Sequence, residues 1–510
     1  MPGSPRTLSS TTDFGALVVD PLREGRTLPL RRRHEQRWLA LARVAPLVFL
    51  VAVCLVLATL AAHESSFLSP TSTRQSYPSW MAGPLANLWP ASPLSTRAME
   101  RVVGGALAAL FLAYVLVLRA APAIRPRWII ASILAVHLIF LLAPPLQYTD
   151  VFNYINYGRM GVVHHLNPYA FLPLQEPHND PAYAISNWHY LRSPYGPLFS
   201  LLTYALVPLG VTASLWTLKI IVGACSLALL ALVWRFARLL GRPPAPAVAF
   251  VGLNPIVLVW GLGGIHNDFI MVLFILTAVY LLMAPRIAGQ RSGPPRDLTL
   301  AGGPAGHELL AAALLIGAVG IKASAVVFLP LALAIAQRPR RLLVGMGATA
   351  AVLALASFLA FGLHIGGVRA QSTLVSPEGL PNLLGLVLGQ GGETAVLRAL
   401  LAGTATAVIL VAAARARRRP LGAMEYGCVT ALALIFTLGW SAPWYVLWAL
   451  PFAALISARR YRTVLLVYTA YALIASSPNV AEIENALHFH PRDGRLGQQH
   501  VAQFEHLAAQ

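Results

Sequence analysis

Charged residues are scarce in this sequence. Asp, Glu, Lys and Arg make up only 11% of its 510 residues, whereas hydrophobic residues make up 57%. Soluble domains carry about 25% charged residues, so a soluble globular protein is excluded. Mean hydropathy is +0.64, and many apolar runs reach the ~17–25 residues needed to cross a bilayer. The sequence therefore predicts a polytopic membrane protein.

Cysteine is rare, and nucleotide-binding motifs are missing. The three cysteines, Cys54, Cys225 and Cys428, lie inside apolar runs and are odd in number, so we expect neither a disulfide framework nor a metal site from them. The sequence contains no Walker lysine motif and no glycine-rich strand-to-helix loop. We therefore expect no nucleotide and no other cofactor.

Lysine is almost absent, although the formal net charge is +19 and only two of the 38 basic residues are lysines. The arginines cluster in short segments between apolar runs, as the positive-inside rule expects of cytoplasmic loops. This charge indicates anchors near lipid head groups, so we expect membrane lipids and no nucleic acid as partners. The clusters are Arg31–Arg33, Arg125/Arg127, Arg235/Arg238/Arg242, Arg338/Arg340/Arg341, Arg417–Arg419 and Arg459/Arg460/Arg462.

Length and hydropathy predict an all-α bundle of roughly thirteen transmembrane spans. They divide the chain into a basic cytoplasmic segment (1–40), a transmembrane domain (41–477) and a polar tail (478–510) for which we expect disorder. The first span is expected to be a signal-anchor, because no small-residue cleavage site follows it. The predicted spans are Leu41–Ala62, Val102–Leu118, Ile129–Leu146, Ala213–Trp234, Ala245–Leu262, Phe269–Ala284, Leu309–Ile321, Ala325–Ala336, Leu342–Leu363, Thr394–Ala414, Leu421–Leu438, Trp444–Ile456 and Val464–Ala475.

Alternation of these spans from a cytoplasmic N-terminus puts every basic cluster inside and three long polar stretches outside. Those stretches are His63–Arg101, Gln147–Pro197 and His364–Glu393. We therefore expect extracytoplasmic loops to form the functional site of a multi-pass plasma-membrane protein.

An acid opens the polar stretch after the third predicted span. Pro144-Pro145 ends that span, and Thr149 or Asp150 could cap a new helix. On this helix Asp150, Asn153, Tyr154 and Tyr157 share one face, since they lie at offsets of 0, 3, 4 and 7. A carboxylate, an amide and two phenols on one face are suited to binding a sugar. A carboxylate next to lipid is energetically costly, which favours a functional role for it. The alternative is that Asp150 only caps the helix.

A second candidate group is Gly263–Asp268, at the outer end of one predicted span. His266 could hold a phosphate or a hydroxyl, and Asn267 beside it is a further substrate-binding candidate. Asp268 could orient His266, bind sugar, or merely cap the next helix.

Basic and aromatic residues complete the candidate set. Lys322 falls at the outward turn of the apolar stretch Leu309–Ala336, where a desolvated ammonium needs an anion such as a lipid phosphate; snorkelling to the interface is the alternative. Arg192 is another phosphate candidate. It precedes the rigid turn Ser193–Pro197, which carries Tyr195 as a substrate-binding candidate.

Short motifs occur in a fixed order between about Leu142 and Pro330: Asp150–Tyr154 with Tyr157-Gly158, Asn167–Tyr169, Pro194–Leu198, Asn254-Pro255, Gly264–Asp268 and Ile321–Ala323. In this ordered set the chain resembles the integral-membrane glycosyltransferases of the GT-C superfamily. More narrowly, it resembles the polyprenol-phosphate-mannose-dependent α-1,6-mannosyltransferases that build envelope lipomannan in actinobacteria. The family usually has Ser-x-Asp-Val-Tyr-Ser-Tyr at the acid, where this chain has Thr149, Phe152 and Asn153.

The resemblance implies that Asp150 is the catalytic base of an inverting transfer from a β-linked polyprenyl-phosphate sugar to a glycolipid or lipoglycan acceptor. Lys322, Arg192 or His266 would then stabilise the departing phosphate, and no metal is required. Three alternatives stay open: a secondary transporter, which the lack of an internal repeat disfavours, a lipid-binding scaffold, and an enzyme that uses another sugar, such as arabinose.

Overall fold

A computed structural model describes residues 30–62, 66–69, 78–85, 88, 95–147, 150–289, 303–364 and 374–496. The chain divides into two units, Met1–Ala42 and Arg43–Gln510. The described part of the first unit is helical from Leu30. Everything below concerns the second unit.

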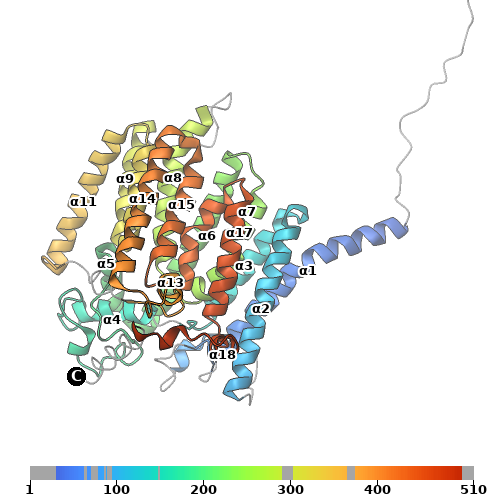
Figure 1. Cartoon of the computed structure of the whole chain (residues 1–510), viewed down its shortest axis with the longest axis horizontal. Helices are drawn as coiled ribbons and strands as arrows, with labels where there is room; N and C mark the ends of the chain where they lie inside the picture. Colours follow the sequence, from blue (N-terminus) through green and yellow to red (C-terminus); the bar gives the residue numbers. More distant parts are fainter. Residues whose placement is uncertain are drawn as a thin grey trace, which may run out of the picture. The chain divides into compact units, whose positions relative to one another are not determined.

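Over the described ranges the protein is helical and contains no strand (Figure 1), which confirms the predicted all-α class. Short 3-10 turns join several helices, of which η8 (Ala323–Phe328), η10 (Pro443–Trp448) and η11 (Pro491–Asp493) matter below. The helices are α1 (Leu30–Leu60), α2 (Thr96–Ala120), α3 (Pro126–Leu142), α4 (Asp150–Val162), α5 (Pro197–Leu206), α6 (Gly210–Leu239), α7 (Pro244–Gly252), α8 (Asp268–Gly289), α9 (Gly303–Ile321), α10 (Leu329–Ile335), α11 (Pro339–Phe361), α13 (Leu380–Val387), α14 (Ala395–Arg418), α15 (Ala423–Thr437), α16 (Leu450–Ala454), α17 (Arg459–Ala475) and α18 (Val480–Ala486).

The predicted count of about thirteen spans is not confirmed. Within the described ranges, seven helices are long and apolar enough to cross a membrane, or eight if the bent pair α17 and α18 is one span. Part of the difference comes from apolar helices of only 10–17 residues, and part comes from breaks. The run predicted at Ala245–Leu262 is divided at Asn254-Pro255 into α7 and a π-helical segment, Val257–Leu262. The run predicted at Trp444–Ile456 is divided into η10 and the short α16.

The centre of the bundle is formed by α8, which packs against α6 and α9, while α9 in turn packs against α11. Most of α8 is buried, whereas α11 and α14 expose many large apolar side chains. Exposed apolar surface over this length is expected where a helix faces lipid. We therefore expect α11 and α14 to face lipid, while α8 lies inside the bundle.

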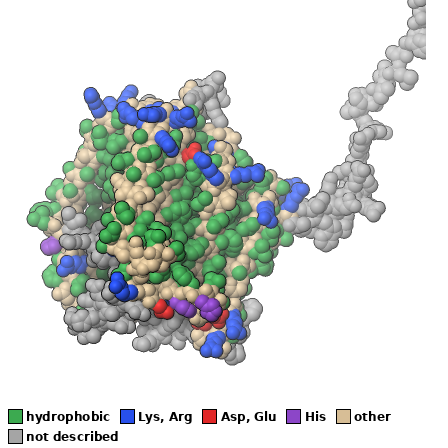
Figure 2. All heavy atoms as spheres, in the orientation of Figure 1, with side chains coloured by type: hydrophobic (Ala, Val, Ile, Leu, Met, Phe, Trp, Pro, Cys, Tyr) green, Lys and Arg blue, Asp and Glu red, His purple; other side chains and the backbone are tan. Residues whose placement is uncertain are grey.

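Basic residues gather at one end of the bundle (Figure 2). The clusters at the start of α11, the end of α14 and the start of α17 contribute to this end. The short helices α4, α13 and α18 lie at the opposite end (Figure 1). The helix α4, which begins at Asp150, therefore lies at the end of the bundle opposite these basic clusters.

The chain continues with defined structure past residue 478, where the sequence predicts a disordered tail. Residues 478–496 contain α18 and η11. The amide nitrogen of Leu496 donates to the carbonyl of Gly391 (3.1 Å), and Asn382 Nδ2 donates to the carbonyl of Pro491 (3.5 Å). The remainder of that predicted tail, 497–510, lies outside the described residues.

Candidate active site

The first residue of α4 is Asp150. The prediction of a helix here is confirmed, although Thr149, the alternative cap, lies outside the described residues. The backbone before α4 is held to the Gly263 loop, because Leu146 N donates to the carbonyl of Gly263 (2.9 Å). Two of the candidate motifs are therefore neighbours in space.

Asp150 lies between two cavities. The larger, of about 610 Å³, is lined by Asp150 together with residues of the Gln147 segment, the Ser376–Leu380 turn, α17 and α18. The narrower, of about 40 Å³, is lined by Asp150, Tyr157, Tyr195 and Lys322. Three tryptophans, Trp188, Trp440 and Trp444, line both cavities. The Asp150 side chain is only 16% exposed, so the carboxylate is confined but reachable from both spaces.

Asn153, which the sequence predicted to bind substrate, lines neither cavity. Its Nδ2 donates to Asn187 Oδ1 (3.0 Å), and its Oδ1 accepts from the amide nitrogens of Asn187 (3.1 Å) and Trp188 (3.2 Å). Asn153 therefore fixes the turn that brings Trp188 to the mouth of both cavities. Trp188 in turn meets Trp440 edge to face, with ring centroids 5.7 Å apart.

The predicted tyrosines form an aromatic wall. Tyr154 is buried and meets Tyr195 and Phe199 edge to face, each at 4.8 Å between centroids. Tyr157 donates its hydroxyl to the carbonyl of Leu191 (2.7 Å). Tyr157 and Tyr195 line the narrow cavity, whereas Tyr154 lines neither described cavity. Tyr154 thus supports the wall from behind.

His266 is brought against Asp150. Its Nδ1 lies 3.4 Å from Asp150 Oδ2, and its ring stacks on Trp444 at 3.5 Å between centroids. Ile265 adopts a positive φ of 57°, and a Cβ on Gly264 would lie 2.6 Å from His266 Nε2. The same Cβ would lie even closer to the carbonyl oxygen of Trp260, so this position has no room for a side chain. Asn267 is buried beside it.

Asp268 and Lys322 form a buried pair. Lys322 Nζ lies 3.0 Å from both carboxylate oxygens of Asp268, and Trp448 Nε1 donates to Asp268 Oδ1 (2.6 Å). The ammonium also lies over the rings of Tyr445 (4.6 Å) and Trp448 (5.5 Å), which favours a cation there. Lys322 is an extended residue between α9 and η8, at the turn that the sequence predicted.

Arg192, the other predicted phosphate ligand, is exposed and lines neither cavity. The turn that follows it approaches Lys322 instead: Gly196 N donates to the carbonyl of Ile321 (3.0 Å). A Cβ on Gly196 would lie only 2.2 Å from the carbonyl oxygen of Gly320. The Ser193–Pro197 turn therefore positions the lysine by backbone contact.

The opposite face of α4 fastens the loop 163–196. Arg159 and His164 both bind Asp180, at 2.8 Å and 2.7 Å, and Asn156 donates to Glu176 (2.6 Å). Burial raises the pKa of Glu176 to about 7 despite the hydrogen bond from Asn156. Burial also acts on Asp180, but the hydrogen bonds from Arg159, the Ala182 amide and His164 hold its pKa below the usual value.

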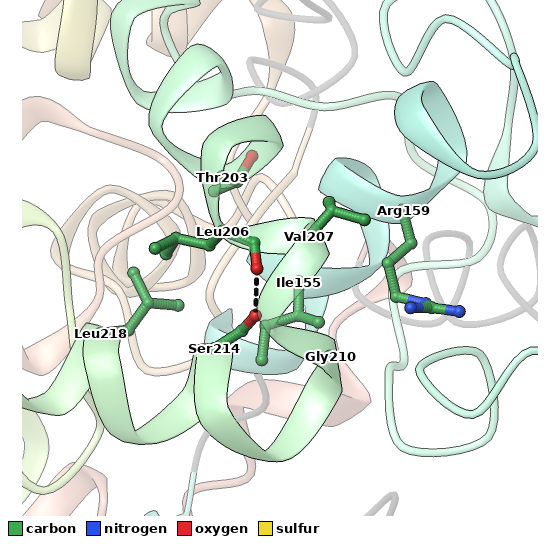
Figure 3. A pocket seen from close by; sticks show the side chains of 8 residues that line it. All are labelled: Ile155, Arg159, Thr203, Leu206, Val207, Gly210, Ser214 and Leu218. Carbon is green, nitrogen blue, oxygen red and sulfur yellow. Dashed lines mark hydrogen bonds between the residues drawn. The ribbon is translucent and has the colours of Figure 1, made fainter.

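A separate crevice between α4, α5 and α6 is not a second polar site (Figure 3). Inside it Ser214 Oγ donates to the carbonyl of Leu206 (2.8 Å), while Arg159 points away from this contact and is satisfied by Asp180. Its lining consists of Ile155, Arg159, Thr203, Leu206, Val207, Gly210, Ser214 and Leu218.

Sequence reasoning missed much of the larger cavity. Glu378, Tyr468, Tyr471 and Arg492 line it, but in the sequence the Ser-Pro-Glu triplet at 376–378 is too short a signal to weigh. Among the described residues no group of three His, Cys, Asp or Glu side chains could hold a metal ion.

Comparison of the sequence with known proteins identifies the family of this chain. A family model described as "Alpha-(1->6)-mannopyranosyltransferase, N-terminal domain" matches residues 50–338, which include Asp150, His266, Asp268 and Lys322. The chain is 26% identical over 374 residues to alpha-(1->6)-mannopyranosyltransferase A of Mycobacterium tuberculosis, covering 66% of this chain and 67% of that relative. It is 27% identical over 356 residues to alpha-(1->6)-mannopyranosyltransferase B of Corynebacterium glutamicum, covering 61% and 56%.

The chain thus spans between 56% and 67% of the length of these two curated relatives, and no solved structure matches it. Since the family model covers more than half of the chain and contains the acid, the histidine and the lysine described above, this protein belongs to the alpha-(1->6)-mannopyranosyltransferase family.

Proposed function

We propose that this protein is an inverting mannosyltransferase of the plasma membrane. It moves mannose from polyprenyl-phosphate-mannose to a glycolipid or lipoglycan acceptor on the outer face, and the product is an α-mannoside. The observation that carries this proposal is the position of Asp150 between a wide cavity and a narrow cavity that reaches Lys322.

Asp150 is the proposed general base. An acceptor hydroxyl in the larger cavity loses its proton to the carboxylate while its oxygen attacks the anomeric carbon of the donor. The bond between that carbon and the phosphate oxygen breaks, and the electron pair leaves with the lipid phosphate. Attack from the side opposite the phosphate converts a β-linked donor into an α-linked product.

The narrow cavity is the proposed site of the donor phosphate. Lys322 is only 13% exposed and lines this cavity. An ammonium has three N–H donors, and the two contacts with Asp268 hold it in one position. A donor oriented before the reaction stabilises developing negative charge without reorganisation. Asp268 is therefore assigned to the positioning of Lys322, since its burial leaves it less suited to a direct sugar contact.

His266 is the proposed positioning residue for Asp150, because it lies between the carboxylate and the flat face of Trp444. Outer-face placement is supported by the basic residues at the opposite end of the bundle. A lipid-linked donor would then reach the site from within the bilayer, and the acceptor from outside.

The test uses the purified full chain with polyprenyl-phosphate-mannose and a short α-mannoside. Wild-type protein is expected to form an α-linked product, and Asp150→Asn to lose at least about a hundredfold in rate. Polyprenyl-phosphate-arabinose serves as the competing donor. Equal product from wild type and Asp150→Asn would remove Asp150 from the mechanism, and product from the arabinose donor alone would overturn the choice of sugar.

A further inference from the structure

The larger cavity has a wall in which the proposed reaction uses only Trp444. This wall is built from residues that follow the family match, which ends at residue 338. It consists of the Ser376–Leu380 turn, Trp440–Trp444, the outer end of α17, the start of α18 and Arg492. The residues proposed for the chemical step thus precede residue 338, whereas the space for the rest of the acceptor is bounded by the later part of the chain.

Glu378 is the charged acceptor group in this wall. Arg492 contacts its Oε1 through Nε (3.0 Å) and a terminal nitrogen (2.9 Å). Oε2 makes no hydrogen bond to any residue that the structure describes. The Glu378 side chain is only 17% exposed, so its charge is held inside the cavity rather than in open solvent.

The backbone around Glu378 is fixed from three directions. Tyr471 donates its hydroxyl to the carbonyl of Glu378. Ser376 Oγ donates to the carbonyl of Ser441 (3.1 Å) and accepts from the Ser441 amide (2.9 Å). Asn382 Nδ2 donates to the carbonyl of Pro377 (2.7 Å). A turn held this firmly keeps the carboxylate at one place, as a binding site requires.

The chemistry of the lining suits a saccharide. Aromatic rings from Trp440, Trp444, Tyr468 and Tyr471 stand beside the hydroxyl of Ser441 and the carboxylate of Glu378. A few fixed polar groups on an apolar wall are typical of small-molecule sites, and about 610 Å³ falls within the usual range of ~300–1,000 Å³. This space exceeds what one hexose ring fills, so it can hold more of the acceptor than the sugar that reacts.

We propose that Glu378 is the acceptor-specificity residue. Its carboxylate accepts hydrogen bonds from hydroxyls of an acceptor sugar other than the one that Asp150 deprotonates, and Arg492 positions it from the C-terminal segment. This inference rests on the proposed function. It assigns the chain-length preference of the enzyme to residues outside the family match.

The experiment compares a mannose monosaccharide glycoside with an α-linked trimannoside as acceptors, in the full-length protein. Glu378→Gln is expected to raise the KM for the trimannoside about tenfold, because a charge-assisted hydrogen bond is lost. The KM for the monosaccharide and for the donor should stay near wild type. Arg492→Gln is expected to shift the trimannoside KM in the same direction, since the carboxylate is then no longer held.

The matched control is Glu425→Gln. Glu425 also accepts from an arginine, Arg460 (2.6 Å), but on α15 and outside both described cavities, so its acceptor kinetics should equal those of wild type. A second readout needs no catalysis. The affinity for the trimannoside, measured without donor by the quenching of tryptophan fluorescence, should be weaker by the same factor in Glu378→Gln.

Two results separate the inference from the proposed function. In the first, wild type transfers mannose, but the ratio of the two acceptor KM values is unchanged in both Glu378→Gln and Arg492→Gln. That result overturns the inference alone. Absence of any transfer by wild type, while the trimannoside still quenches fluorescence and Glu378→Gln weakens that binding, overturns the mannosyl transfer and leaves the cavity assignment standing.

Discussion

The ammonium of Lys322 is bound symmetrically by Asp268, with both carboxylate oxygens at 3.0 Å. The pair is enclosed by Trp448, which donates to the same carboxylate. Lys322 is therefore neither a free cation nor a side chain that snorkels to the interface. It is a donor whose position is fixed by a buried acid, and this arrangement has measurable consequences for stability.

Removing one partner of the pair should destabilise the protein more than removing both. Lys322→Met leaves Asp268 buried and uncompensated, which costs about 3–5 kcal/mol. The double variant Lys322→Met/Asp268→Leu should regain part of that loss while staying inactive. Thermal unfolding in detergent measures both. Arg460→Gln, which breaks an exposed pair, is the control and should leave stability close to that of wild type. A double variant no more stable than Lys322→Met would contradict this account.

His266 should act on the rate and not on acceptor affinity. His266→Ala removes the group 3.4 Å from Asp150, so kcat should fall about tenfold to a hundredfold with little change in KM. Trp444→Phe keeps a ring for the imidazole to stack on and should retain more activity than Trp444→Ala. Steady-state kinetics with both substrates varied gives the comparison, and equal activity of the two Trp444 variants would argue against the stacking role.

Glu176 should make the folded protein less stable as pH rises. Burial raises its pKa from 4.5 to about 7, so between these values the folded state holds a proton that the unfolded state has lost. This proton contributes its full stabilisation to the folded state below about pH 4.5, and the contribution is lost as the pH rises past 7. The free energy of unfolding should therefore fall by at most about 3 kcal/mol over this range.

The measurement for Glu176 is the difference in melting temperature between wild type and Glu176→Gln from pH 5 to 8. Burial also lowers the pKa of His189, so His189 makes the folded protein more stable as pH rises toward 6.5. Wild type and Glu176→Gln share this effect, and it cancels in their difference. The melting temperature of wild type, relative to that of Glu176→Gln, should fall as pH rises. A constant difference would show that Glu176 keeps an ordinary pKa.

Gly196 should tolerate no side chain. Gly196→Ala places a Cβ 2.2 Å from the carbonyl oxygen of Gly320, so the turn must move away from the residues that position Lys322. We expect a loss of about 1–3 kcal/mol together with reduced transfer. Gly347→Ala is the control, because nothing lies within 4 Å of its Cβ. The two variants are compared by melting temperature and by product formed; equal behaviour would mean that the close approach is not maintained.

The sequence predicted the beginning of α4 and the turn at Lys322 because local signals define them. Proline stops a helix before Asp150, and a single lysine stands out in an apolar stretch. The partners could not be predicted. Asn153 shares a helical face with Asp150, yet it binds the Asn187 turn, since side-chain direction depends on a loop 34 residues away. The predicted span count is not confirmed, in part for a related reason: apolar runs that contain Asn254-Pro255 or Pro443 are apolar enough for a membrane but cannot continue as one helix.

The far wall of the larger cavity lies beyond sequence reasoning altogether. Glu378 and Arg492 are 114 residues apart, and each is an ordinary polar residue in its own segment. Only the packing of the C-terminal segment against the Asn382 region brings them together. Such long-range pairs leave no period or spacing in a single sequence.

The helix α4 carries Asp150 at its first residue and fastens loop 163–196 through Asn153, Asn156 and Arg159. A rotation of α4 that displaces the carboxylate must therefore break contacts with this loop. Folding of the loop and alignment of the carboxylate are thermodynamically linked. A ligand that orders the loop would increase the fraction of molecules that are ready to react, and damage to Asp180, which does not touch either cavity, would appear as slower turnover.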